Sequence, residues 1–199
     1  MKHFTSADWH QKEGRYWTTL FNTISGPRTV VMIGTQNAVG IGNIGLFNSL
    51  VHIGAKPPLM GFILRPTSVS RHTYENLKIN GVYTINHVST KLIEMAHQSS
   101  AKYDSQIDEF NEIGLTKELT EGFKAPFVQE SPIKLGLEFV EDHFIQTNGT
   151  RLIVGEIKHV IIDSRLIRSD GFVDTTMAET VLTSGLDAYH SHQLMLRKP

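Results

Sequence analysis

The pattern of apolar positions along the chain predicts a protein built mainly from strands. Short runs of β-branched and alternating apolar residues lie between turn residues, as is typical of half-buried and buried strands. We predict strands over residues 28–35, 45–53, 59–64, 82–88, 134–145 and 151–162. The last two ranges flank Asn148-Gly149, a strong signal for a tight hairpin turn, so we expect these two strands to pair.

Helical spacing is confined to a few shorter segments. Apolar residues three and four positions apart predict a helix over residues 14–24, which Gly26-Pro27 ends. A second helix is predicted over 71–80, where Gly81 supplies the C-terminal cap. The remaining helical predictions are a helix from Ser89 or Thr90 through Ala96, a turn within 106–113 in an otherwise irregular region 98–126, and a short helix within 174–183.

The order of these elements favours one fold class. Strands come in runs, with helices inserted between hairpins, which favours an antiparallel barrel with flanking helices (α+β, mainly β) over a doubly wound parallel sheet. No repeat or Pro/Ser-rich linker divides the chain. We therefore predict a single domain over residues 1–199, with a helical N-terminal segment 1–25 and a C-terminal tail 166–199.

Composition excludes several classes of function. The 199 residues carry a net charge of −1, which excludes a strongly basic nucleic-acid surface. The chain has no cysteine, which excludes disulfides, cysteine zinc sites, iron–sulfur clusters and thiol nucleophiles. The longest apolar stretch is 59–64, far short of a membrane span, and the first residues lack the apolar core of a signal peptide. We expect a cytoplasmic protein that binds neither nucleic acid nor membrane.

The most informative polar stretch is residues 65–76, at the predicted start of the 71–80 helix. It contains serine and threonine hydroxyls together with Arg65, Arg71 and His72. A helix start presents unpaired N–H groups and a positive dipole end, so this set suits an anion such as a phosphate monoester. Arg71 alone would oppose the dipole, and a bound anion would remove that penalty. The alternative is that Ser68 or Ser70 is a plain N-cap beside surface arginines.

Two further candidates carry weaker signals. Around residues 42–50, glycines allow close approach of a ligand, and Asn48 and Ser49 could hydrogen-bond to a heteroaromatic ring; the alternative is a bulged barrel strand. The ten histidines include His190-Ser191-His192, but no helical pair or matching carboxylate accompanies them, so we expect no metal site. No dinucleotide-binding turn, Walker loop or nucleophile elbow is present, and no catalytic residue is identified.

The order of several segments resembles the flavin reductase-like flavoproteins with an FMN-binding split barrel. The resemblance covers roughly residues 25–165 and is carried by the following segments: Arg28-Thr-Val-Val-Met-Ile-Gly-Thr, Asn43-Ile-Gly-Leu-Phe-Asn-Ser-Leu, Lys56-Pro-Pro-Leu, Arg65-Pro-Thr-Ser-Val-Ser-Arg-His-Thr-Tyr-Glu-Asn-Leu, Gly81-Val-Tyr-Thr-Ile-Asn, Ser105-Gln-Ile-Asp-Glu-Phe-Asn-Glu-Ile-Gly-Leu-Thr and Ala125-Pro-Phe-Val-Gln-Glu-Ser-Pro. The family more often has two small hydroxyl residues where Asn48-Ser49 stands. Region 98–124 varies widely within it.

The resemblance implies a homodimer with FMN in a cleft between the subunits. It implies that the FMN phosphate meets Arg65, Ser68, Ser70, Arg71, His72 and Thr73. The flavin ring would meet Phe47, Asn48 and Ser49, with His97, Ser99 and Ser100 nearby. The tail, with Tyr189, His190 and Arg197, would reach the same site or that of the partner.

The resemblance leaves the activity open between several classes. The first is an oxidoreductase that transfers hydride from NAD(P)H to flavin and passes electrons to a small-molecule acceptor. The others are an FMN-binding electron-transfer protein, an oxygenase-type flavoprotein like the pyridoxamine phosphate oxidases, and, if the resemblance is set aside, a small barrel that only binds partners. A protein that binds no flavin would support the last.

Overall fold

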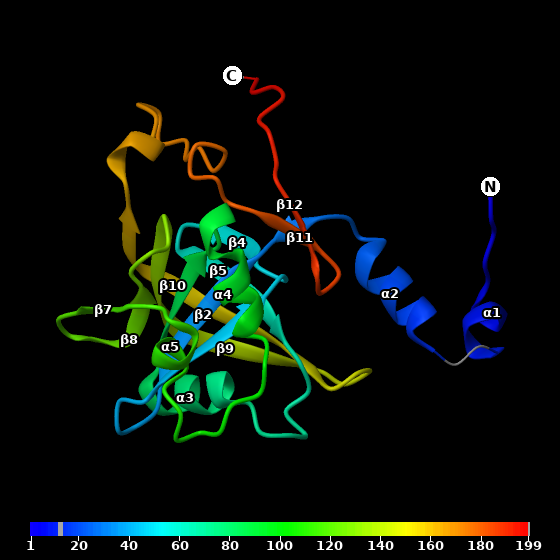
Figure 1. Ribbon diagram of the computed structural model, residues 1–199, viewed down its shortest axis with the longest axis horizontal. Coiled ribbons are helices and arrows are strands. Elements are labelled where there is room, and N and C mark those ends of the chain that lie inside the picture. Colours follow the sequence, from blue (N-terminus) through cyan, green and yellow to red (C-terminus); the bar gives the residue numbers. More distant parts are fainter. Residues whose placement is uncertain (12–13, 199) are drawn as a thin grey trace.

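The computed structural model describes residues 1–11 and 14–198. Its centre is a seven-stranded antiparallel sheet with the strand order β3-β2-β6-β9-β10-β5-β4 (Figure 1). These strands are β2 (Val31–Gln36), β3 (Gly42–Phe47), β4 (Val51–Ala55), β5 (Pro58–Leu64), β6 (Val82–His87), β9 (Ile133–Ile145) and β10 (Thr150–Ile162). The predicted fold class, mainly antiparallel β with flanking helices, is confirmed.

The sheet curls into a barrel that is split between its two edge strands. Phe47 of β3 and Phe62 of β5 belong to opposite ends of the strand order, yet their ring centroids lie 4.9 Å apart. In the described part of the chain, β3 and β4 do not pair with each other. The curl therefore brings the residues that join these two strands to the open seam of the barrel.

Apolar side chains are buried on both faces of this sheet. On β2, Val31 and Ile33 enter the barrel core with Phe62, Tyr83 and other side chains. Met32, which points to the opposite face, packs under the helices and the remaining strands. A strand buried on both faces reads as a continuous apolar run, which explains why the sequence identified β2 without an alternating pattern.

Helices and smaller sheets surround the barrel. The helices are α1 (Ser6–Gln11), α2 (Arg15–Thr23), α3 (His72–Asn80), α4 (Ile93–Gln98) and α5 (Glu109–Ile113), with 3-10 turns η1 (Thr90–Leu92) and η2 (Ser164–Leu166). One small sheet joins β1 (Arg28–Thr29), β11 (Leu182–Ser184) and β12 (Ala188–His190), and another joins β7 (Lys117–Thr120) and β8 (Phe123–Val128). In the described residues, no helix combines the length and apolar character needed to cross a bilayer.

Several local predictions are confirmed. The helices predicted over 14–24 and 71–80 correspond to α2 and α3, and Gly81 caps α3 in the left-handed conformation with a φ of 69°. The hairpin across Asn148-Gly149 forms as β9 and β10. The helix predicted to start at Ser89 or Thr90 forms as η1 followed by α4.

Four predictions are wrong. The strand predicted over 28–35 is two strands, because β1 pairs with β11 in the small sheet and β2 begins at Val31 in the large one. The strand predicted over 45–53 is two strands, because the chain leaves β3 after Phe47 and starts β4 at Val51. The region predicted to be irregular contains the hairpin β7–β8. The helix predicted within 174–183 is replaced by turns and β11, because Val181 donates its N–H to the carbonyl oxygen of Val88, at 2.9 Å, and Leu182 pairs with Thr29.

Candidate functional site

The helix α3 begins without a side-chain cap. Its N-cap residue is Arg71, whose side chain makes no capping hydrogen bond, so neither Ser68 nor Ser70 is the N-cap. The Ser70 hydroxyl donates to Glu75 Oε1 at 2.8 Å, and the Arg71 N–H donates to the same oxygen at 3.2 Å. N–H groups in the first turn have no partner inside the helix, so this helix start keeps donors that can face an anion.

Positive charge gathers at this helix start. Arg65 is exposed in the preceding loop, and Arg71 is half-buried, with its Nε donating to the Pro66 carbonyl oxygen at 3.2 Å. Ser68 and Ser70 are exposed beside them. The Arg71 guanidinium, the hydroxyls and the positive dipole end, with Arg65 in the same loop, form a donor set that fits a phosphate monoester beside the Glu75 carboxylate.

Thr73 points away from this cluster. Its side chain is buried, and its hydroxyl donates to the side-chain amide oxygen of Asn43 on β3 at 3.1 Å. The Thr35 hydroxyl donates to the same oxygen at 3.3 Å and accepts from the Asn76 amide of α3 at 3.2 Å. The Thr73 hydroxyl is therefore part of a buried polar network that ties α3 to β3, and its backbone N–H is the group left at the helix start.

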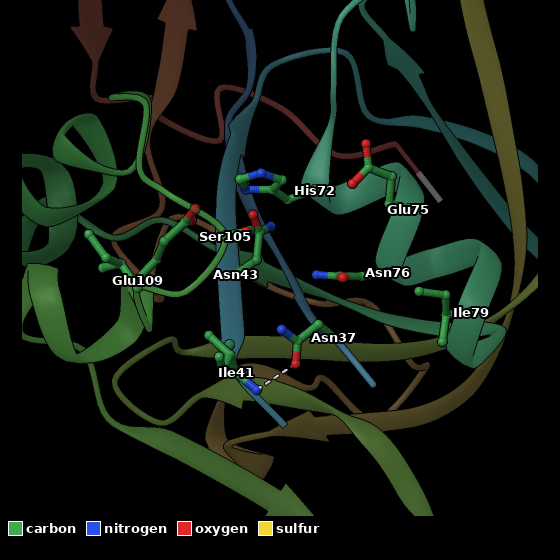
Figure 2. Close-up of a pocket in the computed structure, with 11 residues that line it drawn as sticks. Asn37, Ile41, Asn43, His72, Glu75, Asn76, Ile79, Ser105 and Glu109 are labelled. Atoms are coloured by element: carbon green, nitrogen blue, oxygen red, sulfur yellow. Dashed lines mark hydrogen bonds between the residues drawn. The ribbon is translucent and has the colours of Figure 1, made fainter. Parts of the chain in front are cut away.

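A small pocket lies beside this network, between α3, β3 and the segment that leads into α5 (Figure 2). Its volume is about 150 Å³, and its walls include His72, Asn43, Asn76, Ser105 and Glu109. Figure 2 shows the Asn43 side chain at the centre of this group, with His72 and Ser105 on either side. His72 thus connects the helix start to the pocket.

Glu109 is a buried acid in this wall that the sequence did not reveal. Its Oε2 accepts the Ile44 N–H at 2.8 Å. Burial disfavours the charged form and raises the pKa of Glu109 to about 7, against the Ile44 hydrogen bond, which lowers it, and with the charge of Asp108, which adds to the rise. Asp108 accepts the Gly42 N–H at 2.9 Å and pairs with Lys117. Glu109 lies 65 residues along the chain from Ile44, and Asp108 lies 66 residues from Gly42, so nothing in the local sequence indicates these contacts.

Phe47, Asn48 and Ser49 lie where β3 gives way to β4. The Phe47 ring contacts the barrel core edge-on. The Asn48 side-chain amide donates to the Gly185 carbonyl oxygen at 2.5 Å, and the Ser49 hydroxyl exchanges hydrogen bonds with the backbone of Ile63 at 2.9 and 3.2 Å. These two polar side chains hold the seam of the barrel to β5 and to the C-terminal hairpin.

The third group of predicted residues closes the end of α4. The Ser99 and Ser100 hydroxyls donate to the carbonyl oxygens of Ala96 and His97, each at 2.7 Å. His97 is exposed, and its Nδ1 lies 3.0 Å from the Tyr189 hydroxyl of β12. The C-terminal hairpin thus meets a predicted site residue.

The rest of the tail takes other partners. Arg197 pairs with Asp170 at 2.5 Å, and its guanidinium carbon lies 4.3 Å from the centre of the Phe172 ring. His190 is exposed on β12.

Comparison with known proteins identifies the family. The model of the flavin reductase like domain matches residues 25–176. A split-barrel protein from Shewanella frigidimarina NCIMB 400, assigned as a flavin reductase, is 41% identical, with a TM-score of 0.95 over 100% of this chain and 99% of that one. The flavoredoxin of Desulfovibrio vulgaris (Miyazaki F) is 25% identical, with a TM-score of 0.74 over 86% of this chain and 90% of its own.

A more distant likeness concerns the fold alone. Nitrilotriacetate monooxygenase component B from Bacillus cereus is 14% identical, with a TM-score of 0.86 over 100% of this chain and 98% of that one. The family match covers most of the chain, including α3, the loop before it with Arg65 and Arg71, and both strands at the barrel seam. The chain therefore belongs to the flavin reductase-like family of split-barrel flavoproteins.

Proposed function

We propose that this protein binds FMN and acts as an oxidoreductase that transfers hydride from NAD(P)H to the flavin. The observation that carries the proposal is the start of α3, where the N-cap residue Arg71 makes no side-chain capping hydrogen bond and brings a cation to the N-terminus. A cation at that end of a helix is unfavourable unless anions join it. Glu75 supplies one carboxylate there, already bound by the Ser70 hydroxyl and the Arg71 N–H, and a phosphate monoester would supply a second anion.

The residues of the chain divide the work of binding. Arg65, Ser68, Ser70, Arg71 and His72 would hold the phosphate, together with the backbone N–H of Thr73. Phe47, Asn48 and Ser49 at the seam would line the ring, with His97, Ser99 and Ser100 near its other side. Bound FMN supplies the redox chemistry, so the protein needs to position the ring and exclude competing reactions rather than provide an acid–base pair.

We also propose that two copies of the chain form the complete flavin site. The pocket beside His72 holds about 150 Å³, below the roughly 300–1,000 Å³ typical of small-molecule sites, so this pocket alone encloses too little space for a flavin. The helices α1 and α2 extend away from the barrel (Figure 1), and their aromatic rings pack on one another. A homodimer would give this arm a surface to cover and the flavin a second wall.

The first test is the visible absorbance of the purified protein. We expect a flavin spectrum and, after heating, release of close to one FMN per chain. A colourless protein that leaves the fluorescence of added FMN unchanged would contradict the proposal. Oxidation of NADH or NADPH with FMN present then tests the hydride step. A flavin-bearing protein with no such turnover would instead be the electron-transfer or oxygenase-type alternative.

Arg71 provides the test of where the phosphate lies. Replacing it in Arg71→Ala removes a charge-assisted hydrogen bond, so we expect FMN affinity to fall by about 1.5–3 kcal/mol. The change is measured by fluorescence titration. An unchanged dissociation constant would remove Arg71 from the site.

A further inference from the structure

The tip of the β9–β10 hairpin lies against the loop that leads into α3. Gly149, in the left-handed conformation at the tip, faces Pro66, whose side-chain carbons lie 3.6 and 3.7 Å from the point where a Cβ on Gly149 would stand. Arg151, two residues further on, pairs in register with Leu64, the last residue before the loop. Figure 1 shows this hairpin projecting from the barrel toward the loop between β5 and α3.

Arg151 connects the hairpin to the loop through its side chain. Its Nη1 donates to Asp142 Oδ2 at 3.1 Å, and its Nε reaches the Thr67 hydroxyl at 3.4 Å. The guanidinium carbon lies 5.2 Å from the centre of the Tyr74 ring and 5.1 Å from that of Phe144, so aromatic faces hold its plane. An arginine fixed on several sides can hold a loop in one conformation at little further entropic cost.

Tyr74 extends the same set of contacts to the first turn of α3. Its hydroxyl donates to Asp142 Oδ2 at 2.6 Å, the oxygen that also receives the Arg151 guanidinium. Burial and this hydrogen bond raise the pKa of Tyr74, so the hydroxyl stays a donor at neutral pH. Asp142 therefore joins β9, β10 and α3 at one oxygen atom.

We propose that Arg151, Asp142 and Tyr74 are positioning residues that hold the 65–70 loop in the shape that binds the flavin phosphate, and so set the preference for FMN over flavins without a phosphate. The inference rests on the proposed function. None of the three needs to touch the phosphate. They act through the loop, because Pro66, which faces Gly149 at the hairpin tip, presents the carbonyl oxygen that accepts the Arg71 Nε hydrogen at 3.2 Å.

This placement predicts a selective effect. Ordering the loop before binding lowers the entropic cost of forming the phosphate contacts, but it leaves the ring contacts at the barrel seam unaffected. Loosening the loop should therefore weaken FMN binding and spare riboflavin, which has the same ring and no phosphate. A residue that only stabilises the fold would affect both flavins or neither.

The experiment compares FMN and riboflavin affinities by fluorescence titration in matched variants. Arg151→Lys keeps the charge but loses the planar fork and its stacking on two rings, and Tyr74→Phe removes only the hydroxyl that binds Asp142. Arg168→Lys is the control, because Arg168 also pairs with an aspartate, Asp174 at 2.7 Å, and stacks on Phe172, at 5.2 Å, away from the loop. Thermal unfolding followed by circular dichroism checks that each variant is folded.

We expect Arg151→Lys to lose about tenfold in FMN affinity, and Tyr74→Phe somewhat less, while riboflavin affinity changes by less than about twofold in both. The control should match the unmodified protein for both flavins. Folded variants that keep the full ratio of FMN to riboflavin affinity would overturn the role of Arg151 and Tyr74. Equal losses for the two flavins would also overturn it.

The behaviour of the unmodified protein separates this proposal from the function on which it rests. If that protein binds neither flavin, the proposed function fails. If it binds FMN more tightly than riboflavin and the variants do the same, the proposed function stands and only the positioning role fails.

Discussion

Two ionisable side chains, the half-buried His87 and the buried Glu109, have pKa shifts that act on stability in opposite directions. His87 lies at the end of β6, and within the described structure its Nδ1 has no hydrogen-bond partner. Burial lowers the pKa of His87 from 6.5 to about 4. Burial raises the pKa of the Glu109 carboxyl from 4.5 to about 7. Each shift makes the free energy of unfolding depend on pH.

The sign differs between the two residues. Between pH 4 and 6.5 the unfolded state binds the proton that native His87 refuses, so His87 makes the protein less stable as the pH falls. Between pH 4.5 and 7 native Glu109 keeps a proton that the unfolded state releases, so Glu109 makes the protein more stable as the pH falls.

Urea unfolding at pH 5 and pH 7 separates these effects. The quantity compared is the free energy of unfolding at pH 7 minus that at pH 5. Relative to the unmodified protein, we expect this difference to be roughly 2 kcal/mol smaller in His87→Gln and roughly 2 kcal/mol larger in Glu109→Gln. Both variants exchange a titrating group for a neutral one of similar size. Two variants whose stability runs parallel to that of the unmodified protein across this range would show that neither group is shifted.

For individual residues, the sequence predicts which polar groups gather at the helix start better than it predicts which distant residues they hydrogen-bond to. The arginines, serines and histidine of the 65–76 stretch are adjacent in the chain, so their meeting at one helix start could be foreseen. The inward turn of Thr73 could not, because its partner Asn43 lies 30 residues earlier on another element. Asn48 is a stronger case, since its hydrogen-bond acceptor on Gly185 lies 137 residues away.

At the scale of elements, the contact between β6 and β10 shows how closely the barrel interior is packed. A Cβ added to Gly155 of β10 would lie 2.3 Å from the Tyr83 hydroxyl of β6 and 2.9 Å from two atoms of its ring. The Tyr83 side chain is completely buried, and within the described structure its hydroxyl has no hydrogen-bond partner. Gly155 also sits at an irregularity in the pairing of β10 with β9. The two strands thus fit together only without a side chain at position 155.

Substitutions at these two positions should be coupled. We expect Gly155→Ala to destabilise the fold by about 1–3 kcal/mol, because the buried ring has no room to move. Tyr83→Phe removes the unpaired hydroxyl, so it should cost little and should recover part of the loss when combined with Gly155→Ala. A double-mutant cycle of urea unfolding energies measures the coupling, and strictly additive effects would argue against the contact.

The elements that sequence predicts and those it misses differ in what stabilises them. The β9–β10 hairpin follows from alternation and a turn that are both local. β11 and β12 are three residues each and depend on distant partners, since β11 pairs with β1 at the other end of the chain. Local helical spacing within 174–183 is overridden by these pairings. The break between β3 and β4 has the same origin, because Ser49 is held by Ile63 of the neighbouring strand rather than by its own segment.

At the scale of the whole molecule, the N-terminal arm formed by α1 and α2 is the part whose stability is least explained by contacts within one chain. Phe4, Trp9, Trp17 and Phe21 pack their rings mainly on one another. The side chains of Tyr16, Phe21 and Ile24 remain 58%, 47% and 73% exposed. Isolated helices shorter than about 12–15 residues are marginal in water, and α1 and α2 have six and nine residues. A second copy of the chain would supply the missing surface.

Tryptophan fluorescence can report whether the N-terminal arm is covered by a second copy of the chain. Its two tryptophans, Trp9 and Trp17, both lie in the arm, so tryptophan emission observes the arm alone. We expect Ile24→Asp to shift the emission to longer wavelength and to lower the mass measured by light scattering from dimer to monomer. Leu119→Asp is the control, since Leu119 is similarly exposed, at 66%, but lies on β7 at the opposite side of the barrel (Figure 1). A protein that is monomeric at all concentrations would contradict the dimer.

The acidic residues beside α5 also limit how copies of the chain can associate. Asp108 and Glu109 accept the outward N–H groups of Gly42 and Ile44, so the free side of β3 is already occupied by carboxylates. An edge strand with open donors invites a neighbour to extend the sheet, and unregulated extension leads to aggregation. Here that route is closed at Gly42 and Ile44. A second copy that approaches this part of β3 would therefore meet carboxylate side chains rather than a row of open N–H donors.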